Sequence, residues 1–166
     1  MLERQALWLG PWSALSQAGG KAVLCHRLLY DASRRDLLGT VRQIDAQGWW
    51  PRLARLIVEV HESEDDSLLF TMSRRWALGE SWVVGDADRR PVGKLCGNLL
   101  RDALGRRLAV LEKQDGGISG RWRDLEGREL GTFAEADQGV LATFDGSSTE
   151  NPFVRMLLLA TLLRPR

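Results

Sequence analysis

The sequence has few of the residues that most often mark a catalytic or metal site. Its 166 residues include only 2 cysteines and 2 histidines. Cys25 and Cys96 form no Cys-x-x-Cys motif, which indicates two free thiols in a reducing cytoplasm, with a single disulfide as the alternative. His26 and His61 offer few bases for a Ser-His-Asp triad, and neither has the spacing of a zinc ligand. We also find no nucleophile elbow and no P-loop, and therefore predict a non-enzymatic protein without cofactor or metal.

Neither sign of charge dominates, and no apolar run is long. The chain has 23 Lys+Arg against 22 Asp+Glu, a balance that argues against a nucleic-acid-binding protein. The longest apolar stretch, 156–163, supplies about half of the ~20 residues that a membrane-spanning helix needs. The first residues lack the pattern of a signal peptide. We expect a cytoplasmic protein without a transmembrane span, and peripheral attachment to a membrane stays open.

What the sequence does have is a recurring turn. Each copy begins with aspartate, continues through a short polar stretch and ends where a small or apolar residue resumes a strand; the copies are 86–93, 102–109, 124–131 and a looser one at 31–39. Aspartate accepts hydrogen bonds from amides two residues on, and Gly105 and Gly127 can supply a positive φ. With alternating stretches such as 57–61 between the turns, the pattern predicts ten to twelve antiparallel strands in a sandwich or barrel.

The C-terminal segment departs from this β pattern. Asn151 suits a helix N-cap and Pro152 the first helical position. Apart from Arg155 and Thr161, the helix expected over about 152–163 is apolar on every side. It is too short for lipid, so we expect a β-barrel to enclose it, with Arg164 and Arg166 at the negative end of its dipole. The residues expected to build this central helix are Phe153, Val154, Met156, Leu157, Leu158, Leu159 and Leu162.

These features lead to one domain, a closed antiparallel barrel of about twelve strands over 21–166 that encloses the C-terminal helix. Residues 1–20 are weakly patterned and are expected to form a lead-in. The order of the stretches 69–76 and 82–93, the later Asp turns and the closing helix 151–163 resembles that of the tubby C-terminal-like superfamily. The likeness is to its bacterial LURP-one-related and phospholipid scramblase-like members and covers roughly 22–163.

The resemblance implies a twelve-stranded barrel around a central helix and, in tubby-type domains, binding of phosphoinositide headgroups. Scramblase-like members are associated with calcium-dependent movement of lipid. This sequence has no Pro-rich amino-terminal region, no cluster of cysteines and no acidic calcium segment near the helix. Lipid scrambling is therefore the third hypothesis, after binding of anionic phospholipid headgroups or the membrane surface and a structural or protein-interaction module without lipid binding.

Four Arg-Arg pairs are the candidate headgroup ligands, because a guanidinium binds phosphate through two hydrogen bonds. They are Arg34 and Arg35, Arg74 and Arg75, Arg89 and Arg90, and Arg106 and Arg107. Three of the pairs lie in turns that contain aspartate, so solvated, neutralised turns are the alternative. In a strand, adjacent side chains point to opposite faces, so at most one of Arg74 and Arg75 can join a given patch.

Two clusters of acidic residues are further candidates for metal binding, and several tryptophans are candidates for contact with a membrane. Asp86 and Asp88 have the opening spacing of a calcium loop, but Arg90 and Pro91 replace the residues that the loop requires next. The acids at 62–66 are expected to form a solvated turn rather than a metal site. Tryptophans at positions 8, 12, 49 and 50 suit either a membrane interface or the filling and covering of a barrel.

Overall fold

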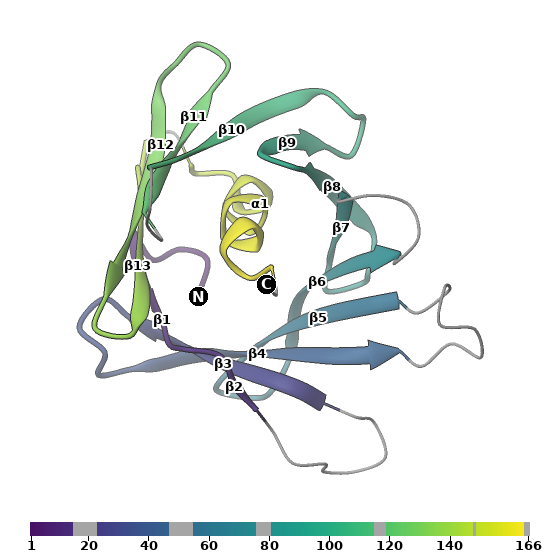
Figure 1. Ribbon diagram of the computed structural model, residues 1–166, viewed down its shortest axis with the longest axis vertical. Helices are drawn as coiled ribbons and strands as arrows, with labels where there is room; N and C mark the ends of the chain where they lie inside the picture. The colour runs from purple at the N-terminus through teal and green to yellow at the C-terminus, as the bar shows by residue number, and fades with distance from the viewer. Residues whose placement is uncertain (15–22, 47–54, 76–80, 115–118, 148, 165–166) are drawn as a thin grey trace.

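The computed structural model describes residues 1–14, 23–46, 55–75, 81–114, 119–147 and 149–164. Within them the chain forms one antiparallel sheet that curves into a ring around a single helix (Figure 1). The strands are β1 (Ala6–Leu9), β2 (Ser13–Ala14), β3 (Val23–Asp31), β4 (Leu37–Ala46), β5 (Arg55–Glu62), β6 (Leu68–Arg75), β7 (Ser81–Asp86), β8 (Pro91–Cys96), β9 (Leu99–Asp102), β10 (Arg107–Lys113), β11 (Gly120–Asp124), β12 (Glu129–Ala136) and β13 (Gly139–Phe144). The helix α1 spans Pro152–Leu162.

The ring is closed by the first strand of the chain. β1 pairs with β13, with Ala6 opposite Thr143, and also with β3, with Leu7 opposite Asp31. β2 pairs with β3 as well, so β1 and β2 together act as one interrupted strand of a twelve-stranded closed barrel. The closed antiparallel barrel expected from the sequence is confirmed. Part of the expected lead-in belongs to the barrel wall, and residues 15–20 lie outside the described residues.

The Asp turns form as the sequence predicts. Asp102 Oδ1 accepts hydrogen bonds from the amides of Leu104 (2.9 Å) and Arg106 (2.8 Å), and Gly105 adopts φ +82°. The carboxylate of Asp124 binds the amides of residues 126 and 128 in the same way. These bonds add to the backbone bonds that Asp102 and Asp124 make across each turn, which is why one short sequence pattern recurs at the ends of successive strand pairs.

The turn carboxylates make the stability of the barrel sensitive to acid. Burial by itself raises the pKa of Asp102 and of Asp124, but hydrogen bonds from Arg106 and Arg128 and from turn amides outweigh it, so both pKa values lie below the ordinary value. Stability gained from a lowered carboxyl pKa is present above the unfolded-state pKa and is lost as pH falls through the folded-state pKa. The free energy of unfolding, measured by urea titration at several pH values, is therefore expected to fall below about pH 4. In Asp124→Asn this acid dependence should be weaker; an identical dependence would contradict the assignment.

The C-terminal helix lies inside the ring (Figure 1) and packs against β7 and β8. Asn151 is its N-cap, its side-chain oxygen accepting a hydrogen bond from the Phe153 amide at 2.9 Å, and Pro152 is the first helical residue. Residues 157–160 are all but inaccessible to solvent. Gly93 on β8 permits this approach, because a Cβ there would lie 2.8 Å from a Leu157 methyl carbon. Enclosure is thus confirmed, although Phe153 at the start of the helix is 45% exposed.

The two polar residues of the helix are buried with partners. Thr161 Oγ1 accepts a hydrogen bond from the Trp122 indole at 3.0 Å and donates one to the carbonyl of Leu158. Arg155 donates to the carbonyls of Thr149, Leu2 and Arg4. A buried polar group is tolerated when its hydrogen bonds are satisfied, so neither residue interrupts the packing of the helix. No helix in the described part of the chain is long and apolar enough to cross a bilayer.

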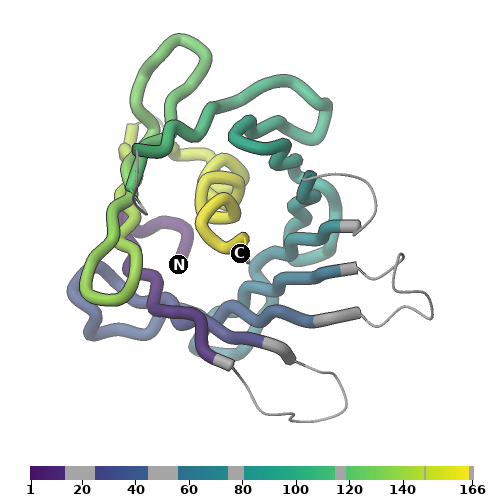
Figure 2. Tube along the Cα trace, in the orientation of Figure 1, coloured from purple at the N-terminus to yellow at the C-terminus, as the bar shows by residue number. Residues whose placement is uncertain are grey.

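Because the strands form a meander, their turns alternate between the two ends of the barrel. The first rim carries the turns after β3, β5, β7, β9 and β11, and α1 begins there beside the segment 2–5. The second rim carries the turns after β8 and β12, and α1 ends there. In Figure 2 the start of the chain and the helix both lie within the ring of strands.

Candidate functional site

The four Arg-Arg pairs are not gathered into one patch, and half of their members have acidic partners. The ion pairs join Arg34 to Asp137 (2.8 Å), Arg89 to Glu59 (3.3 Å), Arg90 to Asp88 (3.4 Å) and Arg106 to Asp102 (2.6 Å). The Arg34 guanidinium also stands 4.6 Å from the centre of the Trp8 ring, on the outside of the barrel. For these four arginines the structure favours the neutralised turn over a headgroup ligand.

The remaining members of the pairs lie in different places. Arg35 lines a first-rim groove together with three carboxylates, those of Asp36, Glu62 and Glu64. Arg74 follows Phe70 and Met72 at two-residue spacing, which places it on the inner face of β6. The side chain of Arg75 lies outside the described residues. Arg107, the last of the eight paired arginines, is exposed at the start of β10, where other cations lie beside it.

Arg107 belongs to a row of three cations on neighbouring strands. Lys94 on β8 lies directly opposite Arg101 on β9, and Arg101 lies opposite Arg107 on β10. Gly93, Leu95 and Leu100 are buried beside them, so the row faces outward. Residues directly opposite each other in an antiparallel pair have Cβ atoms about 5 Å apart. We call Lys94, Arg101 and Arg107 the cation row.

The cation row has no acidic partner in the described part of the chain. Arg101 donates to the carbonyl of Gly105 at 2.8 Å, and no described residue forms an ion pair with Lys94, Arg101 or Arg107. The nearest carboxylate in sequence, that of Asp102, is occupied by Arg106 and by turn amides. Like charges directly opposite one another on a sheet are destabilising. An anion bound across the row would relieve that repulsion.

An apolar tip stands next to the cation row. Leu104, in the turn between β9 and β10, is 78% exposed, and Leu125, in the turn between β11 and β12, is 60% exposed. Both turns lie at the first rim, and β10 and β11 are paired neighbours. Exposed leucines beside cations combine the two contacts that an anionic lipid surface offers, phosphate and hydrocarbon.

Other candidate ligands have ordinary partners. No group of three or more His, Cys, Asp or Glu residues among the described residues could hold a metal ion. In the acidic turn, Asp65 accepts a hydrogen bond from the Ser67 amide, and Asp66 is paired with Arg42 at 2.6 Å. Both cysteines are free thiols and partly exposed. Trp49 and Trp50 fall outside the described residues.

The sequence reasoning missed two members of the cation row. Lys94 and Arg101 are single cations in separate strands, and only the register of β8, β9 and β10 brings them beside Arg107. A bulge between Arg107 and Ala109 shifts that register, so counting residues along the chain does not reveal the row.

Comparisons with models of known protein families, with curated proteins and with solved structures give no match for this chain.

Proposed function

We propose that this protein is a non-enzymatic domain that binds anionic phospholipid headgroups at a membrane surface in the cytoplasm. The observation that carries the proposal is the cation row, Lys94, Arg101 and Arg107, in which three adjacent cations lack acidic partners in the described part of the chain. Phosphate accepts charge-assisted hydrogen bonds from both arginine and lysine, and each basic residue near an anionic membrane contributes about 1 kcal/mol.

Leu104 supplies the second contact of the proposed orientation. Its side chain is exposed at the tip of the β9–β10 hairpin, three residues from Arg107, so a surface that meets the cation row can also meet this leucine. Burying an exposed leucine in the acyl boundary adds hydrophobic free energy to the electrostatic attraction. The two contacts together favour a lipid surface over a free phosphate ion.

The architecture supports a family proposal as well. A twelve-stranded antiparallel barrel that encloses an apolar C-terminal helix is what the resemblance to the tubby C-terminal-like superfamily implies. We therefore propose that the chain is a bacterial-type member of this superfamily, related to the LURP-one-related and phospholipid scramblase-like proteins.

Vesicle co-sedimentation tests the lipid proposal. Wild-type protein is expected to sediment with vesicles of phosphatidylcholine and phosphatidylserine but not with phosphatidylcholine alone, and binding should weaken as salt is added. Replacing the cation row by glutamine (Lys94→Gln, Arg101→Gln and Arg107→Gln together) is expected to weaken binding about a hundred-fold, at about 1 kcal/mol per cation.

The matched control removes the same charge from ion-paired arginines, in Arg90→Gln, Arg121→Gln and Arg128→Gln together. This variant should retain most of the binding, and an equal loss would show that net charge alone is responsible. Negligible binding of the wild type to both kinds of vesicle would exclude the proposal. Recovery of a stoichiometric protein partner in a pull-down insensitive to lipid would favour the interaction-module hypothesis instead.

A further inference from the structure

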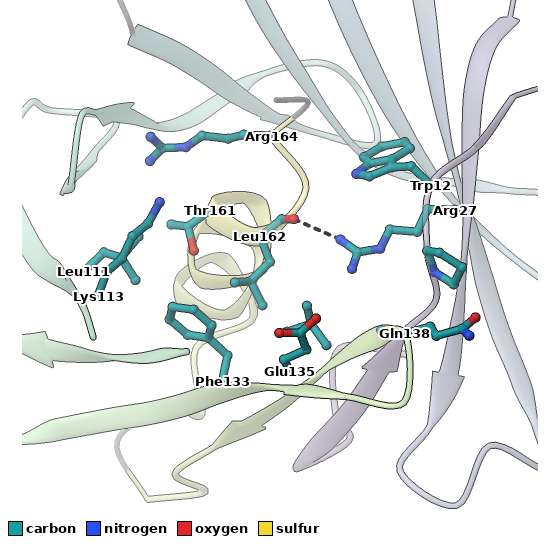
Figure 3. Close-up of a pocket in the computed structure, with 13 residues that line it drawn as sticks. Trp12, Arg27, Leu111, Lys113, Phe133, Glu135, Gln138, Thr161, Leu162 and Arg164 are labelled. Atoms are coloured by element: carbon teal, nitrogen blue, oxygen red, sulfur yellow. Dashed lines mark hydrogen bonds between the residues drawn. The ribbon is translucent and has the colours of Figure 1, made fainter. Parts of the chain in front are cut away.

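A second site lies inside the barrel, at the second rim. A cavity of about 450 Å³ opens beside the end of α1 (Figure 3). Residues from β3, β10, β12 and β13 and from the end of the helix surround it; they include Arg27, Lys113, Glu135, Thr161, Leu162 and Arg164. The volume lies within the range of small-molecule sites in proteins. None of these residues belongs to the cation row, which faces outward.

On two strands that reach this rim, β10 and β12, a charged side chain follows the apolar inner face. On β10 the inner face begins with Ala109 and Leu111, both at most 2% exposed, and Lys113 follows at the same two-residue spacing. On β12, Glu135 follows the buried Phe133 in the same way. Interior-facing and exterior-facing residues alternate along a barrel strand. The inner faces of β10 and β12 therefore change from apolar to charged where they reach the cavity.

Among the described residues of the lining, cations outnumber acids. They are Arg27, Lys113 and Arg164, against the one carboxylate of Glu135. Arg27 binds the end of α1, donating a hydrogen bond to the carbonyl of Leu162 at 3.0 Å. It also donates to the carbonyl of Leu9 on β1. It stabilises the negative end of the helix dipole, a role expected from the sequence for Arg164 and Arg166. Lys113 makes no ion pair with any described residue, and Figure 3 shows its ammonium on the same side of the helix as the Arg164 guanidinium.

Another part of the lining is apolar. Leu111, Phe133, Val140 and Leu162 form the part of the wall next to the barrel core, and Trp12 borders the cavity near Arg27. At about 30 Å³ for each water-sized group, the cavity has room for about fifteen such groups. That is enough room for a single medium-length hydrocarbon chain with one polar head.

We propose that this cavity binds a compact amphiphilic anion, with its acidic head at Lys113 and its apolar body against Leu111, Phe133 and Val140. The charge of the lining selects an anion, and the apolar wall selects a ligand with a hydrocarbon part. Glu135 faces the same space and limits affinity for an anionic head. The site is independent of lipid binding at the cation row.

Isothermal titration calorimetry with decanoate, below its micellar concentration, tests the proposal. Lys113→Gln is expected to weaken decanoate binding about ten- to a hundred-fold, the value of one charge-assisted hydrogen bond. Glu135→Gln should act in the opposite direction and tighten binding, because it removes the carboxylate that repels the head. Lys113 and Glu135 are both exposed, so neither substitution is expected to prevent folding.

Three comparisons complete the experiment. Decyl phosphate distinguishes a phosphate from a carboxylate head, and tighter binding of either one supports the site. Decanol and decylammonium should bind more weakly than both, and equal binding of all four compounds would overturn the proposal, as would decanoate affinity unchanged in Lys113→Gln. Lys94→Gln, in the cation row, should leave decanoate binding intact, and Lys113→Gln should leave vesicle binding intact. The two variants therefore test the two proposed sites independently.

Discussion

Replacing Leu158 with arginine is expected to abolish folding of the barrel. Leu158 lies in the middle of α1 and is 0% exposed, among neighbours that are also buried. Burying a charge without a partner costs several kcal/mol, and removing a packed leucine costs about 2–5 kcal/mol more. The total is comparable with the whole stability of a domain of this size, which is about 5–15 kcal/mol.

Far-ultraviolet circular dichroism and thermal melting check this expectation. Leu158→Arg should give no cooperative transition or remain insoluble. Phe153→Arg is the control, because it introduces the same charge into the same helix at a position that is 45% exposed. Its melting curve should stay close to that of the wild type. A normal melt for Leu158→Arg would mean that the helix is not enclosed in solution.

Arg155→Leu is expected to cost about 2–5 kcal/mol of stability, the second largest effect. Arg155 is 7% exposed, and its guanidinium donates to the carbonyl of Thr149 from one side and to those of Leu2 and Arg4 from the other. Leucine leaves these carbonyls without a donor, and each buried acceptor that loses its partner costs about 1–3 kcal/mol. The bonds join α1 to the segment that precedes β1, so their loss should also loosen the first rim.

Urea titration measures the loss, and hydrogen exchange locates it. Amides of β1 should exchange faster in Arg155→Leu, because β1 follows directly on the segment that Arg155 holds. Arg121→Leu provides the comparison: Arg121 forms an exposed ion pair with Glu112 at 2.8 Å and should change stability by less than about 1 kcal/mol. Equal losses in the two variants would show that the bonds to Leu2 and Arg4 contribute nothing.

The local features and the general architecture of this fold could be predicted from the sequence, but the strand pairings between distant segments could not. The turns at Asp102 and Asp124 follow from carboxylates that bind amides within four residues, and the helix follows from Asn151 and the apolar stretch after it. Closure of the barrel was expected from the apolar helix, but the strand that closes it was not identified. That strand, β1, lies in the expected lead-in and has four residues, and its partner β13 is distant in the sequence.

The candidate sites show the same division. The arginine pairs were prominent in the sequence, yet half of these arginines are neutralised by acids. The cation row depends on the register across three strands, and the role of Arg27 depends on a contact with Leu162, 135 residues away. The inward position of Lys113 could have been predicted from strand periodicity, since Lys113 shares the two-residue spacing of Ala109 and Leu111.

The pairing of β1 with β13 has a consequence for biosynthesis. The ribosome releases Ala6 long before Thr143, its partner in the closed barrel, and α1 emerges later still. Until then the growing chain exposes the apolar inner faces of its strands, including Phe70 and Met72, with neither a sealed wall nor a helix to cover them. Final assembly must wait until α1 has left the ribosome, and it is expected to be slow because contacts between distant residues are entropically costly to form. Nascent chains of this protein are therefore expected to depend on chaperones that shield apolar surface.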